Sequence, residues 1–362
     1  MRVLAGFAAI TAGLLAMGGL VTADVESPAL AKYKKPVEEA VERGLGYLAK
    51  HQIASGQPLA GSFESPGIRG NPGVTALCVM AFLSKGHTPG TGKYGEVIDR
   101  AIDYVLSTQD SKTNLLIGPH GGWGQMYTHS IATLMLAEVS GMVDPDRQRK
   151  IDVVLPKALN LIVSAQRIRK SPAEAGGWRY QPTSTDSDIS QTGWAVMALR
   201  AGRLNGAAVP RECIEDAVNY ILRCRRPDGG FAYRSNGERG SGLARTGVAV
   251  LCLELCGRHG EPAGVAGAEY ILRTMPRTAT PKYYVFYYGE YYCSQAMFQL
   301  GGKYWETWAP VMYDLFIKAQ QADGSWPIAL DYNADAPGTC YATAMAVLAV
   351  TVSYRQLPIY QR

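Results

Sequence analysis

Apolar residues recur along this sequence with the period of an α-helix, in two alternating kinds of segment. Segments of the first kind are amphipathic, as in 37–52, where Glu38, Glu42 and Arg43 lie on a polar face. Segments of the second kind are apolar on nearly every side, as in 74–82 and 192–199. A helix that is apolar all round has to be buried all round, so the pattern predicts inner helices covered by outer ones.

This alternation occurs six times. We predict outer helices at 37–52, 97–109, 155–166, 213–225, 264–275 and 308–320. An inner helix follows each of them and begins near Thr75, Ser130, Thr192, Thr246, Ser294 or Thr343. The pairs start roughly 50 to 60 residues apart, a spacing typical of repeat arrays. An open solenoid is the alternative, but its terminal repeats would need polar caps and neither end shows one, so we expect the six pairs to close.

A short motif joins the two helices of most pairs. The outer helix usually ends on glutamine, and a turn with glycine and an aromatic residue follows at 61–63, 121–123, 176–178, 229–231 and 324–326. The fifth repeat lacks this turn and carries a tyrosine-rich run at 283–292 instead.

The motif resembles the QW repeat of squalene–hopene and oxidosqualene cyclases, whose helix-pair toroid is shared by protein prenyltransferase β subunits. The resemblance covers about residues 37–353 and implies an all-α fold, an α/α toroid with an inner and an outer ring. In these cyclases the glutamine and tryptophan are structural. The resemblance therefore implies a scaffold role for Gln52, Gln109, Gln166, Gln320, Trp123, Trp178 and Trp326.

The third repeat is similar to the cyclase segment that carries the Asp-x-Asp-Asp-Thr motif, whose middle Asp is a general acid. Matched residue by residue, Asp186 takes the first position, Asp188 the acid position and Ser190 the Thr position, while Ile189 replaces the last Asp. Losing that carboxylate weakens the case for protonation of an alkene. Asp188 followed three residues later by Gln191 also fits a capping box that starts a helix, and the two roles can coexist.

The remaining candidates lie where the inner helices are expected to begin, around one mouth of the ring. Glu290 falls at the same repeat position as Asp188, so with Asp186 these are the candidate catalytic residues. Aromatic side chains can stabilise a cation or simply pack, and both readings of the tyrosine run stay open. The candidate ligand-binding residues are His129, Gln191, Arg245, Tyr288, Tyr291 and Tyr292. Arg245 and His129 are expected to neutralise the acids, in a catalytic arrangement or a structural cluster of ion pairs.

A zinc site of the prenyltransferase kind is not expected. That chemistry needs an Asp-x-Cys pair and a later His, and Cys293 is present, but Tyr291 and Gly338 occupy the Asp and His positions. The five histidines show no ligand spacing, and no cofactor is indicated. Most of the seven cysteines fall inside apolar helical patterns, which favours buried thiols.

The composition and the N-terminal residues bear on the partners of the protein and on its cellular compartment. The net charge of +5 over 362 residues is spread out, which gives no case for nucleic acid as a partner. Residues 1–23 are typical of a signal peptide cleaved before Asp24, so we expect export, with a retained anchor as the alternative. Residues 24–36 are expected to form a linker, 37–356 the toroid and 357–362 a C-terminal tail.

Two functions stay open on this basis. The first is an exported toroid that binds an apolar small molecule of isoprenoid type, with terpene-cyclase-like isomerase or lyase chemistry started by Asp188. The second is a toroid without turnover that holds a lipid or a protein partner, with peripheral membrane contact left open. Fold analogy cannot choose between them.

Overall fold

The outer helices of the ring are amphipathic, as the polar face of the first one predicts. The computed structural model describes residues 28–119, 124–278 and 285–361. In α4, for example, Ile98, Ala101 and Val105 are buried while Glu96 is exposed. The six outer helices are α2 (Lys34–Lys50), α4 (Gly95–Ser107), α6 (Pro145–Gln166), α8 (Arg211–Arg223), α10 (Pro262–Thr274) and α12 (Gly302–Ala319).

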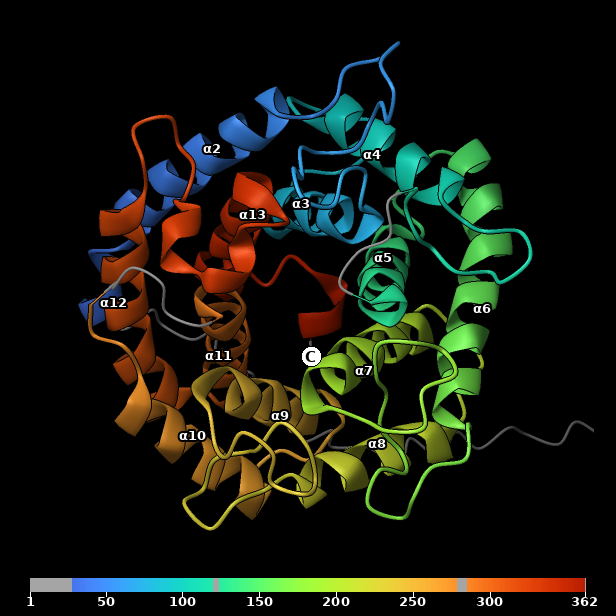
Figure 1. Ribbon diagram of the computed structural model, residues 1–362. Helices are drawn as coiled ribbons and strands as arrows, with labels where there is room; N and C mark the ends of the chain where they lie inside the picture. Colours follow the sequence, from blue (N-terminus) through green and yellow to red (C-terminus); the bar gives the residue numbers. More distant parts are fainter. Residues whose placement is uncertain (1–27, 120–123, 279–284, 362) are drawn as a thin grey trace, which may run out of the picture.

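The inner helices are largely apolar and are buried along most of their length. Every residue of α3 (Pro72–Ser84) is buried, and α13 (Gly338–Val350) has only Thr339 partly exposed. The other inner helices are α5 (Gln125–Val139), α7 (Ile189–Leu204), α9 (Leu243–Leu255) and α11 (Phe286–Leu300). Each inner helix contacts the next, and α13 contacts α3, so the ring closes (Figure 1). The predicted α/α toroid of six helix pairs is confirmed.

The bounds of two outer helices differ from the prediction. Helix α6 begins at Pro145, because Asp144 caps it by accepting hydrogen bonds from the backbone N–H groups of Asp146 and Arg147. Helix α12 begins at Gly302, not near Trp308. Both contain an internal proline, Pro156 and Pro310. The apolar pattern alone misses these helix starts because the added turns carry mostly polar residues.

The glutamines at the ends of three outer helices make the same pair of bonds. The side-chain amide of Gln166 donates to Gly176 O in its own turn and to Cys213 O on the next outer helix, both at 2.8 Å. Gln52 donates to the carbonyls of Gly61 and Val97 in the same way. These amides tie each turn to the following repeat.

The same joint closes the ring between the last repeat and the first. Gln320 donates to Gly324 O at 2.9 Å and to Ala40 O on α2 at 2.8 Å. The turn glycine is required at this joint because Gly324 has a φ of +94° and its Cβ would lie 2.5 Å from Arg43 O. The seam is therefore built like the joints inside the array.

The tryptophans of two turns are buried and fixed by their indole N–H groups. Trp178 donates to Ile162 O at 2.7 Å, and Trp326 donates to Phe316 O at 2.8 Å. Their backbone N–H groups donate to the hydroxyls of Thr192 and Thr343 at the starts of the inner helices. Trp123, expected to act likewise, lies outside the described residues.

The chain ends differ from the linker and tail that we expected. In the described part of 24–36, α1 (Pro28–Ala31) and the start of α2 are helical, and Leu30 and Tyr33 are buried. After α13 the chain forms the short 3₁₀ helix η3 (Val352–Tyr354), reverses, and enters the centre of the ring as η4 (Pro358–Tyr360) (Figure 1). Leu357, Ile359 and Tyr360 belong to the core.

The leader predicted for residues 1–23 lies outside the described residues. Among the helices that the structure does describe, none combines the length and apolar character needed to cross a bilayer. All seven cysteines are unpaired, and six of them are buried, as the apolar patterns around them indicate.

Candidate functional site

A cavity of about 580 Å³ lies at the end of the ring where the inner helices begin. Five aromatic side chains from these helices line it: Tyr127, Trp194, Phe286, Tyr288 and Tyr341. Tyr180 and Tyr233, from the turns of the third and fourth repeats, complete the aromatic wall. Its size falls within the range of roughly 300–1,000 Å³ for small-molecule sites.

Part of this aromatic wall is anchored deep in the ring. Trp194 stacks on Tyr291 with ring centroids 5.8 Å apart and an interplanar angle of 12°. Tyr292 meets Trp194 edge-on at 5.3 Å. The hydroxyl of Tyr291 in turn bonds that of Tyr360 at 2.6 Å. Trp194 therefore links the cavity to the C-terminal segment through a single layer of aromatic rings.

Two arginines give the cavity a positive edge, which the Glu238 carboxylate, 3.8 Å from Arg239 Nε, partly offsets. Arg245 donates from Nη2 to Arg239 O at 2.9 Å, and the Arg239 guanidinium lies 4.7 Å from the Tyr233 ring centroid. Both arginines line the cavity together with the first residues of α9, Leu243 and Ala244. A helix N-terminus adds a partial positive charge and free N–H groups, so this edge favours an anionic or strongly polar group.

The Asp188 carboxyl is buried behind the cavity wall, next to Ser190, which lines the cavity. Its Oδ1 accepts from Gln191 N at 2.8 Å and caps α7. Its backbone N–H donates to Trp178 O at 2.9 Å, which fixes the residue against the turn. Burial raises the pKa of Asp188 to about 6, against the opposing effects of the Gln191 N–H and of Arg179. The acid is therefore partly protonated near neutral pH.

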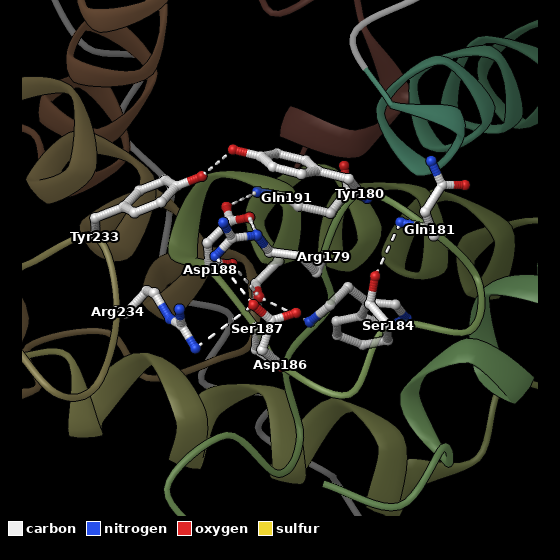
Figure 2. Close-up of polar contacts among 12 residues, drawn as sticks. Arg179, Tyr180, Gln181, Ser184, Asp186, Ser187, Asp188, Gln191, Tyr233 and Arg234 are labelled. Atoms are coloured by element: carbon white, nitrogen blue, oxygen red, sulfur yellow. Dashed lines mark hydrogen bonds and ion pairs between the residues drawn. The ribbon is translucent and has the colours of Figure 1, made fainter. Parts of the chain in front are cut away.

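A network of charges surrounds this carboxyl (Figure 2), and none of its members lines the cavity. Arg179 pairs with Asp188 and Asp186 at 3.5 Å each. Arg234 pairs with Asp186 at 3.5 Å and with Glu174 at 3.1 Å. Asp186 thus takes part in ion pairs that link the third and fourth repeats, and it does not line the cavity.

Two tyrosine hydroxyls separate Asp188 from the cavity. Tyr180 and Tyr233 meet at 2.5 Å between their oxygens, and Figure 2 shows the pair beside Asp188 and Arg179. The Arg179 guanidinium packs on both rings, 4.6 and 5.4 Å from their centroids. These contacts hold the Arg179 guanidinium beside the Asp188 carboxyl.

The profile of the prenyltransferase alpha-alpha toroid domain matches residues 76–272, more than half of the 362-residue chain. The chain belongs to this family. Drimenyl diphosphate synthase of Streptantibioticus cattleyicolor is 24% identical over 168 residues, which is 46% of this chain. The match spans 28% of the length of that curated relative.

Solved structures show the same ring with different activities. The type II terpene cyclase MstE from Scytonema has a TM-score of 0.53 at 14% identity, covering 89% of this chain and 100% of that one. The GH76A α-1,6-mannanase of Salegentibacter sp. HEL1_6 reaches 0.61 at 10% identity, covering 88% and 99%. Cellobiose 2-epimerase from Bacillus thermoamylovorans B4167 reaches 0.62 at 10% identity, covering 89% and 98%. At these identities the likeness shows the fold alone, so the function has to be argued from the site.

Several residues expected in this toroid's mouth lie at the cavity or directly behind its wall. Tyr288 and Arg245 line it, Tyr291 and Tyr292 pack behind Trp194, and Asp188 lies behind the tyrosine pair. Gln191 does not face the cavity, because its amide donates to Met126 O and Ser130 Oγ, both at 3.1 Å. Only the Asp188 half of the expected capping box is therefore formed.

His129 is structural and cannot neutralise the acids as we expected. Its Nδ1 accepts from Leu116 N and its Nε2 donates to Ala158 O, both at 3.0 Å. Burial lowers the pKa of His129 to about 4, so the ring is neutral and ties α5 to α6.

Glu290 does not share the mouth with Asp188. Helix α11 begins at Phe286, so Glu290 lies a full turn inside it, and it is not among the residues that line the cavity. Its side chain is buried, and burial raises the pKa of Glu290 to about 8. The fifth repeat lacks the usual glycine-and-aromatic turn, so its inner helix starts at a different point within the repeat. For this reason Glu290 and Asp188 do not occupy equivalent positions.

Four residues at the site are not predicted from the sequence: Arg179, Tyr180, Tyr233 and Arg239. A signal for the tyrosines exists, since each stands two residues after the turn aromatic, Trp178 or Phe231, in adjacent repeats. No comparable signal points to the arginines, whose positions depend on how the two turns meet.

Proposed function

We propose that this toroid binds an apolar ligand of isoprenoid type, with its chain in the aromatic cavity and its polar end at Arg239 and Arg245. The observation that carries the proposal is the aromatic cavity with its positive edge at the start of α9. Aromatic faces suit both alkene chains and carbocations, and an arginine pair suits a diphosphate or carboxylate.

The family and two similar proteins support this assignment. Drimenyl diphosphate synthase is named for a diphosphate product, and MstE is a terpene cyclase. The glycosidase neighbours share the ring, but glycoside hydrolysis normally needs a pair of carboxylates at the substrate. Among the described residues that line this cavity, none carries a carboxylate. The site therefore favours an isoprenoid over a sugar.

Binding can be tested with farnesol, farnesyl diphosphate and a mannobiose as probes, by titration calorimetry of the full chain. We expect both isoprenoids to bind and the sugar not to. Arg245→Gln should weaken farnesyl diphosphate about tenfold and leave farnesol unchanged, because a charge-assisted hydrogen bond contributes about 1.5 kcal/mol. Arg149→Gln, at an exposed arginine of α6, is the matched control. Binding of the sugar without either isoprenoid would overturn the proposal.

Acid-initiated cyclisation or isomerisation is a second candidate, favoured by the buried and partly protonated Asp188. Its O–H bond would break as a C–H bond forms on the ligand, leaving a carbocation and a carboxylate paired with Arg179. Return of a proton from the cation to the carboxylate would restore the acid, with no net change in formula.

Asp188→Asn separates this role from capping, because asparagine caps a helix about as well as aspartate. We expect native mass spectrometry and product analysis to show a polyprene that wild type converts and Asp188→Asn binds unchanged. If wild type binds the polyprene without converting it, the binding function stands and the catalytic one is contradicted.

Export belongs to the same proposal. A mature N-terminus at Asp24, measured by mass spectrometry of the protein from its source, would support it, and a retained leader would contradict it.

A further inference from the structure

The last residues of the chain occupy the end of the ring opposite the arginine edge. Residues 357–360 pass into the centre of the inner ring, where Figure 1 shows the C-terminus enclosed by the inner helices. Leu357, Ile359 and Tyr360 are at most 6% exposed. We call residues 357–361 the C-terminal plug.

Three hydrogen bonds anchor this plug to inner helices. The Tyr360 hydroxyl bonds the Tyr291 hydroxyl on α11 at 2.6 Å, and Gln299 Nε2 donates to Tyr360 O at 3.3 Å. The Ile359 N–H donates to Glu138 Oε2 on α5 at 3.3 Å. Glu138 and Gln299 lie in the last turns of their helices, far along the ring axis from the cavity-lining helix starts.

Trp194 and Tyr291 connect the plug to the cavity. Trp194 lines the cavity, Tyr291 stacks against Trp194, and Tyr360 bonds Tyr291. The Tyr360 hydroxyl bonds the Tyr291 hydroxyl, so the plug borders the side chain that packs against Trp194. Interiors are close-packed, so the plug determines how far this layer can retreat when a ligand enters.

We infer that the C-terminal plug sets the depth of the cavity and thereby the length of the apolar chain that the toroid accepts. The inference rests on the proposed binding function. Tyr360 is a positioning residue that acts through Tyr291 and Trp194. Shortening its side chain leaves a void that the aromatic layer can occupy, and the cavity gains depth at the opposite face.

The test compares the affinities of geraniol, farnesol and geranylgeraniol, which differ by one isoprene unit each. In Tyr360→Ala we expect the affinity for geranylgeraniol relative to geraniol to rise about tenfold over the wild-type ratio. This follows because about two more buried methylenes contribute about 0.8 kcal/mol each. Tyr360→Phe keeps the volume and removes the hydroxyl, so it is the matched control and should keep the wild-type ratio.

The outcomes separate the two proposals. A folded Tyr360→Ala with an unchanged ratio overturns the plug inference and leaves the binding function standing. Wild type that binds none of the three alcohols overturns both. If Tyr360→Ala does not fold, Tyr360→Leu serves in its place, since it keeps an apolar group there and still shortens the side chain. The same change in the ratio is expected.

Discussion

At the scale of single residues, the inner ring buries acids that carry no compensating charge. Glu290 is 1% exposed and its Oε2 has no hydrogen-bond partner among the described residues, and Glu138 accepts one backbone bond from the plug. Burial raises the pKa of each carboxyl to about 8. The folded protein therefore keeps these protons to higher pH than the unfolded chain does, and stability falls as pH rises from about 4.5 to about 8.

Substituting Glu290 should remove its share of this pH dependence. We expect Glu290→Gln to be more stable than wild type at pH ~8.5, by roughly 2–4 kcal/mol, and to differ much less at pH ~5. Urea unfolding at the two pH values measures this. Glu96→Gln changes a glutamate that is 94% exposed and should leave the midpoint unchanged at both. Equal gains for Glu290→Gln at both pH values would point to packing instead of charge.

At the scale of elements, the turn glycines determine how closely one repeat meets the next. A Cβ at Gly176 would lie 2.2 Å from Asp216 O on α8, and one at Gly324 would lie 2.5 Å from Arg43 O on α2. Both have φ near +90°. The repeats can approach this closely only because neither position carries a side chain.

Alanine at such a turn should cost both strain and a backbone shift. We expect Gly324→Ala to lower the free energy of unfolding by about 3 kcal/mol, combining left-handed strain with overpacking. Gly206→Ala has a similar φ of +80° and nothing within 4 Å of the added Cβ, so it should cost only about 1 kcal/mol. Chemical denaturation of the two variants compares them. Equal losses would show that the close contact with Arg43 O is unimportant.

How much the sequence predicts also follows from the elements. The six helix pairs can be predicted from the sequence because segments such as 74–82 are apolar all round, which only a buried helix permits. The Asp188 cap is readable because it depends on residues close in sequence. The cavity wall cannot be predicted in this way, because its contacts join residues far apart in the sequence. Tyr180 and Tyr233 are separated by 53 residues, and Tyr291 and Tyr360 by 69. Such contacts depend on how turns and the plug pack in three dimensions, which local patterns do not encode.

At the scale of the whole molecule, the seam between the sixth and first repeats should count as much as any internal joint. Gln320 and Gln166 each donate to a turn glycine and to a neighbouring outer helix. We expect Gln320→Ala and Gln166→Ala each to lower the free energy of unfolding by about 1–3 kcal/mol, since each removes the side-chain donor to a partly buried turn carbonyl and to the neighbouring outer helix. Thermal unfolding of both variants tests this. A Gln320→Ala with wild-type stability would mean that the ring behaves as an open array.

The seam between the sixth and first repeats also constrains how a closed toroid can evolve. An open array can gain or lose a unit at its end, because a new unit only needs to match its last neighbour. Here the final turn already meets α2, through Gln320 and the close approach of Gly324 to Arg43. A seventh pair would have to separate that joint and widen the ring. The number of repeats therefore sets the width of the central cavity and the width of the ligand that fits in it. The residues that line the interior remain free to vary.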